Sequence, residues 1–129
     1  MVAGEEIMKD EKYVLIAGCR DFNDYRRAKQ YIDFCISNIR SKYEITIISG
    51  GARGADALEE QYADENEFKV KRYLLDWEKY GRAAGSRRNK IMVDAVDYII
   101  CFWDGESHGT GSTVKYAEKS GKPLRIKYI

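Results

Sequence analysis

Several residues and patterns that define common functional classes are scarce in this chain. It has 1 histidine among 129 residues, which excludes a metal site built from two or three histidine ligands. Its cysteines, Cys19, Cys35 and Cys101, are an odd set without CxxC spacing. That spacing also disfavours a zinc site formed by the cysteines with His108, so we expect no metal. We expect reduced, packed thiols in a cytoplasm.

The chain also lacks a large net charge and a long apolar run. Its 22 Lys and Arg residues nearly balance its 21 Asp and Glu residues, which leaves a net charge of +1. That balance argues against binding nucleic acid or anionic membranes through bulk charge. No apolar run approaches the roughly 18–20 residues that span a bilayer. The start has no basic segment followed by an apolar one, so we expect a cytoplasmic protein without a membrane partner.

Short apolar segments alternate with amphipathic ones from end to end. The apolar segments predict strands over residues 13–17, 45–48, 70–74, 98–102 and 124–128. Helices are predicted over about 25–39, 54–67, 86–95 and, opened by a Gly-rich loop at 105–112, to about 119. This alternation predicts a doubly wound, three-layer α/β domain with about five parallel strands. We expect that domain to cover residues 12–129, after a loose polar tail at 1–11.

In such sheets, ligands bind beyond the carboxyl ends of the strands, so residues that follow the strands are the first site candidates. After the first strand, Gly18 permits a tight turn and Arg20 offers a guanidinium that pairs well with phosphate. The alternative is that Arg20 is a surface residue paired with Asp21 or Asp24.

Three glycines within five positions follow the second predicted strand, just before a helix. They allow the backbone to approach a ligand closely, and the helix start favours an anion. The turn is neither a Walker A loop nor a GxGxxG fingerprint. Its alternative role is a tight turn in which a carboxylate favours the helix start. The candidates for ligand binding here are Gly50, Gly51, Arg53, Gly54 and Asp56.

A cationic segment follows the third predicted strand. Residues 79–90 carry five positive charges and no carboxylate, and Trp77 beside them could stack on a base. Ser86 is predicted to cap the next helix, which would place Arg88 and Asn89 in its first turn. A cation there is unfavourable for the helix dipole unless an anion offsets it. The alternative is a solvated basic loop with Trp77 packed over the core.

The fourth predicted strand is followed by Gly109, Thr110, Gly111 and Ser112, which open a helix with backbone amides and hydroxyl groups. These residues suit a second anion or a ribose in the same crevice. The alternative is a capped helix start and nothing more. His108 lacks a visible partner, and an exposed loop residue is the simpler interpretation than an acid–base group.

Taken in order, these motifs resemble the SLOG superfamily and, within it, the YspA-related family of small proteins. The resemblance implies a Rossmann-like fold with strand order 3-2-1-4-5, a nucleotide or nucleotide-derived ligand, and a homodimer. It implies that the glycines after the second strand hold phosphate, and that Arg88, Asn89, Gly109 and Thr110 line the pocket. The matching segments are 18–22, 50–56, 76–77, 84–89 and 108–110.

The same superfamily includes phosphoribohydrolases of the LOG type and DprA-like DNA-processing proteins. The hydrolases carry a glutamate in a GGxGTxxE pattern, whereas Thr113 follows Ser112 here. Without that carboxylate, ligand binding or sensing is favoured over N-glycosidic cleavage, and we expect no required cofactor. The acidic helix at 54–67 argues against a DNA track, so we do not expect a nucleic-acid partner. If the protein is a hydrolase, its catalytic candidates are Arg20, Asp56, Arg88 and Glu106.

Overall fold

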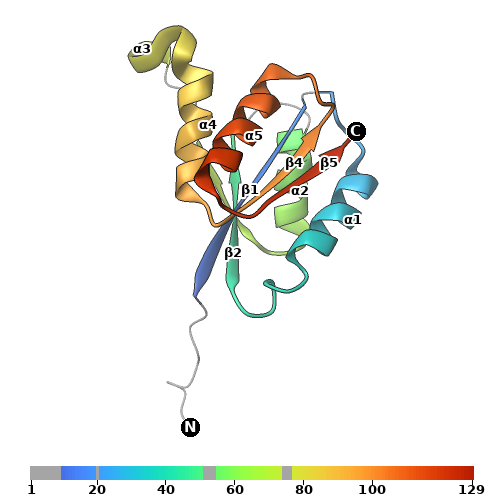
Figure 1. Cartoon of the computed structure of the whole chain (residues 1–129). Helices are drawn as coiled ribbons and strands as arrows, with labels where there is room; N and C mark the ends of the chain where they lie inside the picture. Colours follow the sequence, from blue (N-terminus) through green and yellow to red (C-terminus); the bar gives the residue numbers. More distant parts are fainter. Residues whose placement is uncertain (1–9, 20, 51–54, 74–76) are drawn as a thin grey trace.

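The computed structural model describes residues 10–19, 21–50, 55–73 and 77–129, with the backbone alone for residues 55, 56 and 77. Strands and helices alternate along these residues, as the sequence predicts (Figure 1). The strands are β1 (Glu11–Gly18), β2 (Glu44–Ser49), β3 (Lys69–Arg72), β4 (Tyr98–Trp103) and β5 (Leu124–Tyr128). The helices are α1 (Tyr25–Ile36), α2 (Ala55–Glu65), α3 (Trp77–Tyr80), the 3-10 turn η2 (Gly81–Ala83), α4 (Ala84–Ala95) and α5 (His108–Ser120).

The strands form one 5-stranded parallel sheet in the order β3-β2-β1-β4-β5. This order confirms the predicted doubly wound, Rossmann-like fold. The central strand β1 pairs with β2 on one side and with β4 on the other, so that Leu15 lies between Ile48 and Ile99. The reversal of strand order at β1 places the β1 and β4 turns at the switch point, where ligands bind in such folds.

Both faces of the sheet are covered by helices, which explains the continuous apolar strands. Val14 and Ile16 of β1 pack with α1 and α2 on one face, where Ile32 of α1 is fully buried. Leu15 points to the opposite face, where α4 and α5 pack. The sheet is therefore the middle of three layers (Figure 1). None of the helices in the described ranges is long and apolar enough to cross a membrane.

The start of α4 differs from the prediction. The helix begins at Ala84, directly after η2, so Ser86 lies inside it and does not cap it. Its inward face holds Asn89, Met92 and Val93, whereas Ile91 is 44% exposed. A polar residue, Asn89, therefore occupies an inward position of the helix.

The acidic helix α2 is only partly exposed to solvent. Glu59 is fully buried, beside Leu58 and Tyr62 on the inward face of the helix. Glu60 instead forms an ion pair with Arg72 of β3, so part of the negative charge of α2 is neutralised by a neighbouring strand. Strand β1 begins at Glu11, one residue before the predicted start of the domain at residue 12.

One side chain joins the end of α4 to the turn after α5. Helix α5 ends at Gly121, which is in the left-handed conformation with φ 73°. The next residue, Lys122, donates from Nζ to the carbonyl oxygens of Val93 at 2.7 Å and Asp94 at 2.9 Å. A cation at a helix C-terminus also interacts favourably with the helix dipole.

We expect Lys122→Met to lower the free energy of unfolding by about 1–2 kcal/mol, because it removes charged hydrogen bonds to the end of α4. Urea denaturation at neutral pH measures the change. Lys115→Met is the matched control, since Lys115 is exposed on α5. An equal loss of stability in both variants would contradict this role of Lys122.

Candidate functional site

The turn after β2 is held by a guanidinium from α4. Nη1 of Arg88 donates to the carbonyl oxygen of Gly50 at 3.0 Å. The guanidinium also lies flat against this residue: a Cβ atom at position 50 would stand 3.0 Å from Cζ of Arg88. Glycine at position 50 therefore makes room for the cation, which is half-buried at the carboxyl edge of the sheet.

The next residue of α4 reaches the other glycine-rich turn. Nδ2 of Asn89 donates to the carbonyl oxygen of Gly109 at 3.2 Å, and its Oδ1 lies 3.5 Å from Nη2 of Arg88. Asn89 is 5% exposed, so this amide is a buried, hydrogen-bonded group. Two adjacent residues of α4 thus connect the turn after β2 with the start of α5.

The glycines at the start of α5 have different surroundings. A Cβ atom at position 111 would lie 3.2 Å from Cζ2 of Trp103, so Gly111 allows close packing on the indole. No described residue stands within 4 Å of the equivalent point at Gly109. The helix begins at His108, and the amide of Gly111 is already bonded to the carbonyl oxygen of Ser107. The open approach to the α5 start is therefore at Gly109, while Gly111 serves packing.

Asp104 organises the loop between β4 and α5. Its carboxylate accepts hydrogen bonds from the amides of Glu106 and Ser107, both at 2.8 Å, and from the hydroxyl of Ser107. These bonds, the Ser107 amide foremost, lower the pKa of Asp104 to about 2. The indole Nε1 of Trp103 donates to the carbonyl oxygen of Ser107 at 3.0 Å. The loop is thus held from both sides before the helix begins.

The β1 turn lies beside the same loop. The amide of Cys19 donates to the carbonyl oxygen of Phe102 at 3.1 Å, and the ring of Phe22 stacks on that of Phe102. Burial raises the pKa of the Cys101 thiol to about 12, with smaller contributions from Glu59 and Cys19. This fits the prediction of a packed, unreactive cysteine in β4.

The structure brings together Gly50, Arg88, Asn89 and Gly109 from the predicted site. Thr110 is 5% exposed, so its side chain is buried and its backbone amide is the group to consider. Glu106 is exposed. Outside the described residues lie Arg20, Gly51, Arg53 and Gly54, together with the side chains of Asp56 and Trp77.

A groove of about 470 Å³ lies over the outer side of α5, next to this cluster. Gly111 and Ser112 from the predicted site line it, together with Trp103 and His108. Across the groove, the hydroxyls of Ser86 and Tyr116 are 2.7 Å apart. Ser86 therefore hydrogen-bonds to Tyr116 beside the groove and does not cap α4 as predicted.

Sequence reasoning missed the two residues that shape the start of α5. Asp104 is followed three positions later by a serine, a spacing typical of a carboxylate that accepts from nearby backbone amides, and this signal was available. Trp103 carried no comparable signal, because its partners Ser107 and Gly111 are recognisable only from the fold.

Comparison with known proteins identifies the family. The profile of the YspA, cpYpsA-related SLOG family matches residues 12–80, more than half of the chain. The chain belongs to this family. The matched part of this SLOG protein includes the turns after β1 and β2, whereas Arg88, Asn89 and Gly109 follow it. The gene 61 protein of Mycobacterium phage D29 is 36% identical over 117 residues, which cover 86% of this chain and 92% of that protein.

Solved structures show the same fold at low sequence identity. DNA processing protein A (DprA) from Streptococcus pneumoniae superposes with a TM-score of 0.69 and 16% identity, over 89% of this chain and 50% of that one. A structural-genomics protein named TM1055 gives 0.62 and 19%, over 88% of this chain and 72% of that one. This SLOG protein therefore spans about half the length of DprA, and the likeness concerns the Rossmann-like fold.

We expect Asn89→Ala to lower the free energy of unfolding by about 1–3 kcal/mol, because the carbonyl oxygen of Gly109 loses a buried donor. Urea denaturation measures the effect. The control is Asn38→Ala, at an exposed position beyond α1 that should change stability little. A loss of less than about 0.5 kcal/mol for Asn89→Ala would mean that this hydrogen bond does not hold the turns together.

A second expectation concerns acid stability. The lowered pKa of Asp104 means that its carboxylate stabilises the fold above about pH 4, and that this contribution is lost as the pH falls towards 2. Asp104→Asn keeps an acceptor oxygen but does not titrate, so its melting temperature should fall less than the wild type's between pH 4 and 2. Asp21→Asn, at an exposed position of the β1 turn, should keep the wild-type dependence.

Proposed function

We propose that this SLOG protein binds a nucleotide or nucleotide-derived phosphate ligand between the turn at Gly50 and the start of α5. The observation that carries the proposal is the pair Arg88–Asn89, which hydrogen-bonds both turns from one helix. A guanidinium, an open glycine and the start of a helix of 13 residues converge at the carboxyl edge of the sheet. This is the position at which doubly wound folds bind phosphorylated ligands.

The chemistry of the pair suits a phosphate monoester or diester. A guanidinium such as that of Arg88 carries five N–H donors, and Arg binds phosphate oxygens in a bidentate manner. The first amides of α5 have no acceptor within the helix and point towards the same edge. Because Arg88 is half-buried, a phosphate there interacts with it more strongly than with an exposed cation.

Binding or sensing is supported over N-glycosidic cleavage. Thr113, which stands where the hydrolase pattern has its glutamate, is 2% exposed and packs inward. Asp104 is occupied by backbone amides, and Glu106 lies exposed on the loop that these amides form. Our proposal therefore assigns no catalytic role to Asp104 or Glu106, and it includes no cofactor. A homodimer remains a prediction that light scattering would test.

The test is nucleotide binding by a matched pair of variants. Calorimetry with nucleoside mono- and diphosphates, a cyclic nucleotide and ADP-ribose would first identify a ligand, supported by mass spectrometry of co-purifying molecules. We expect Arg88→Gln to weaken binding at least about tenfold, because charged hydrogen bonds to phosphate are lost. Arg87→Gln is the control, because it removes the same charge from the preceding residue. The guanidinium of Arg87 lies over the ring of Tyr80.

Two outcomes would contradict the proposal. One is a protein that binds no member of the panel and co-purifies with no nucleotide. The other is a bound nucleotide whose affinity falls equally in Arg87→Gln and Arg88→Gln, which would place the ligand elsewhere. Release of free base on incubation would instead support a hydrolase.

A further inference from the structure

A strip of aromatic and cationic side chains covers the edge of the sheet where α1 packs beside β5. Its outer ring, Phe34 of α1, is 64% exposed. This is a large exposure for an apolar residue, which the fold alone does not require. We call this strip the α1–β5 patch; it consists of Arg27, Tyr31, Phe34, Arg125 and Lys127.

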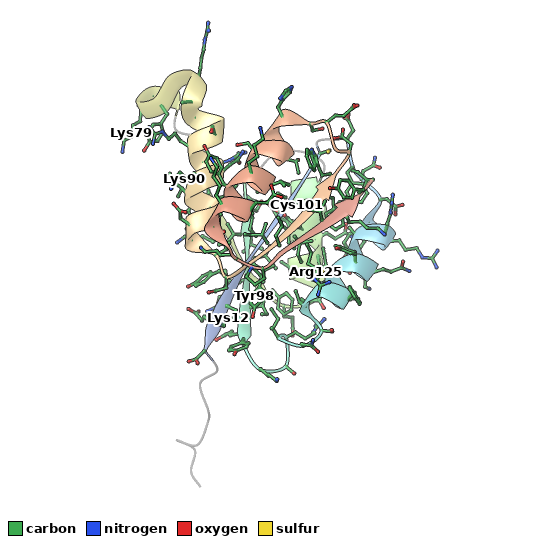
Figure 2. All side chains as sticks on the ribbon, in the orientation of Figure 1. Lys12, Lys79, Lys90, Tyr98, Cys101 and Arg125 are labelled. Atoms are coloured by element: carbon green, nitrogen blue, oxygen red, sulfur yellow. The ribbon has the colours of Figure 1, made fainter. Side chains whose placement is uncertain are left out.

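Contacts between cations and rings hold the patch together. Cζ of Arg125 lies 5.5 Å from the centroid of the Phe34 ring, and Nζ of Lys127 lies 5.6 Å from that of Tyr31. Nη2 of Arg27 donates to the carbonyl oxygen of Tyr128 at 3.1 Å. Figure 2 shows Arg125 beside α1, on the flank of the molecule that α1 and β5 share. The cations are thus fixed next to exposed aromatic surfaces.

The charge of the patch has one sign. Within the described ranges, Arg27, Arg125 and Lys127 form no ion pair with a carboxylate. Elsewhere, cations such as Arg72 and Lys90 are paired, with Glu60 and Asp94. The near-neutral net charge therefore averages over surfaces of different character, and this surface attracts an anion.

A second copy of the chain does not suit this surface. In a two-fold dimer, the same patch faces itself, so the cations of one copy would approach those of the other. Such like-charge contacts cost free energy at an interface. The complementary partner carries negative charges at intervals, to match the cations, and a planar apolar group, to cover Phe34.

We propose that the α1–β5 patch binds single-stranded nucleic acid. Phosphates would contact the guanidinium and ammonium groups of Arg27, Arg125 and Lys127, and an unpaired base would stack on the ring of Phe34. Exposed aromatics along a cationic path are the general means by which proteins bind single strands. This inference departs from the expectation drawn from net charge, and it is independent of the nucleotide site at Arg88.

The test is fluorescence anisotropy of a labelled oligothymidylate with the full chain at several salt concentrations. Three cations on phosphates predict that log affinity falls with log salt at a slope of about −2. The variant Arg125→Gln/Lys127→Gln leaves one of the three cations, so its slope should be about −0.7 and its affinity at least tenfold lower. Phe34→Ala should weaken binding at least about fivefold through the loss of one stacked base.

A matched control carries the same change of charge on other surfaces. Lys12 and Lys71 also lie over tyrosine rings, those of Tyr43 and Tyr73, at 4.9 and 5.3 Å. Lys12→Gln/Lys71→Gln should retain at least half of the wild-type affinity. Arg88→Gln should do the same, which separates this inference from the nucleotide site. Circular dichroism melting would verify that each variant is folded.

Four results would overturn the inference. They are no binding at low salt, an equal loss in the control double variant, equal affinity for duplex of the same length, and displacement by polyglutamate at equal charge concentration. The last result would identify an acidic protein partner instead. Self-association by light scattering that Phe34→Ala abolishes would assign the patch to a second copy of the chain.

Discussion

Two adjacent residues of α4 set the geometry of the carboxyl edge. Neighbouring side chains on a helix diverge by about 100°, so Arg88 and Asn89 reach different turns from one position of the helix. That position is determined by packing, because Met92 and Val93 anchor α4 against the sheet. A side chain at Gly50 would displace the guanidinium and separate the turns. The site is therefore a consequence of how α4 packs, and not of the glycine turns alone.

The charge of the molecule also depends on which residues lie next to one another. A net charge of +1 is the sum of an acidic helix α2, whose Glu60 is paired with Arg72, and of surfaces where cations lie over rings. Composition cannot distinguish a uniformly neutral surface from one with separate acidic and cationic regions, because it does not show which charges are neighbours. How strongly a site binds an ion depends on the charges within about a Debye length of it, roughly 8–10 Å.

The sequence predicted the fold class, and the structure brings four of the predicted site residues together. Strand periodicity and helix spacing are local, so the alternation of elements could be predicted, and the family resemblance supplied the strand order. The resemblance also implied Arg88 and Asn89 as pocket residues, in the segment that follows the third strand. Glu59 was missed because its inward position depends on the phase of α2. The pairing of Trp103 with Gly111 was missed because it forms only when β4 meets α5.

Trp103 and Tyr128 lie between the two proposed binding surfaces. The indole of Trp103 contacts Ser107 and Gly111 at the start of α5, and its ring lies 6.1 Å from that of Tyr128. The carbonyl oxygen of Tyr128 in turn accepts from Arg27 of the α1–β5 patch. Contact alone does not couple two sites, since coupling requires an element with two arrangements that each ligand favours differently. The bond from Nε1 and the close approach of Gly111 hold the indole in one arrangement. Binding at the carboxyl edge and binding at the patch should therefore be energetically independent, although these residues connect the two surfaces.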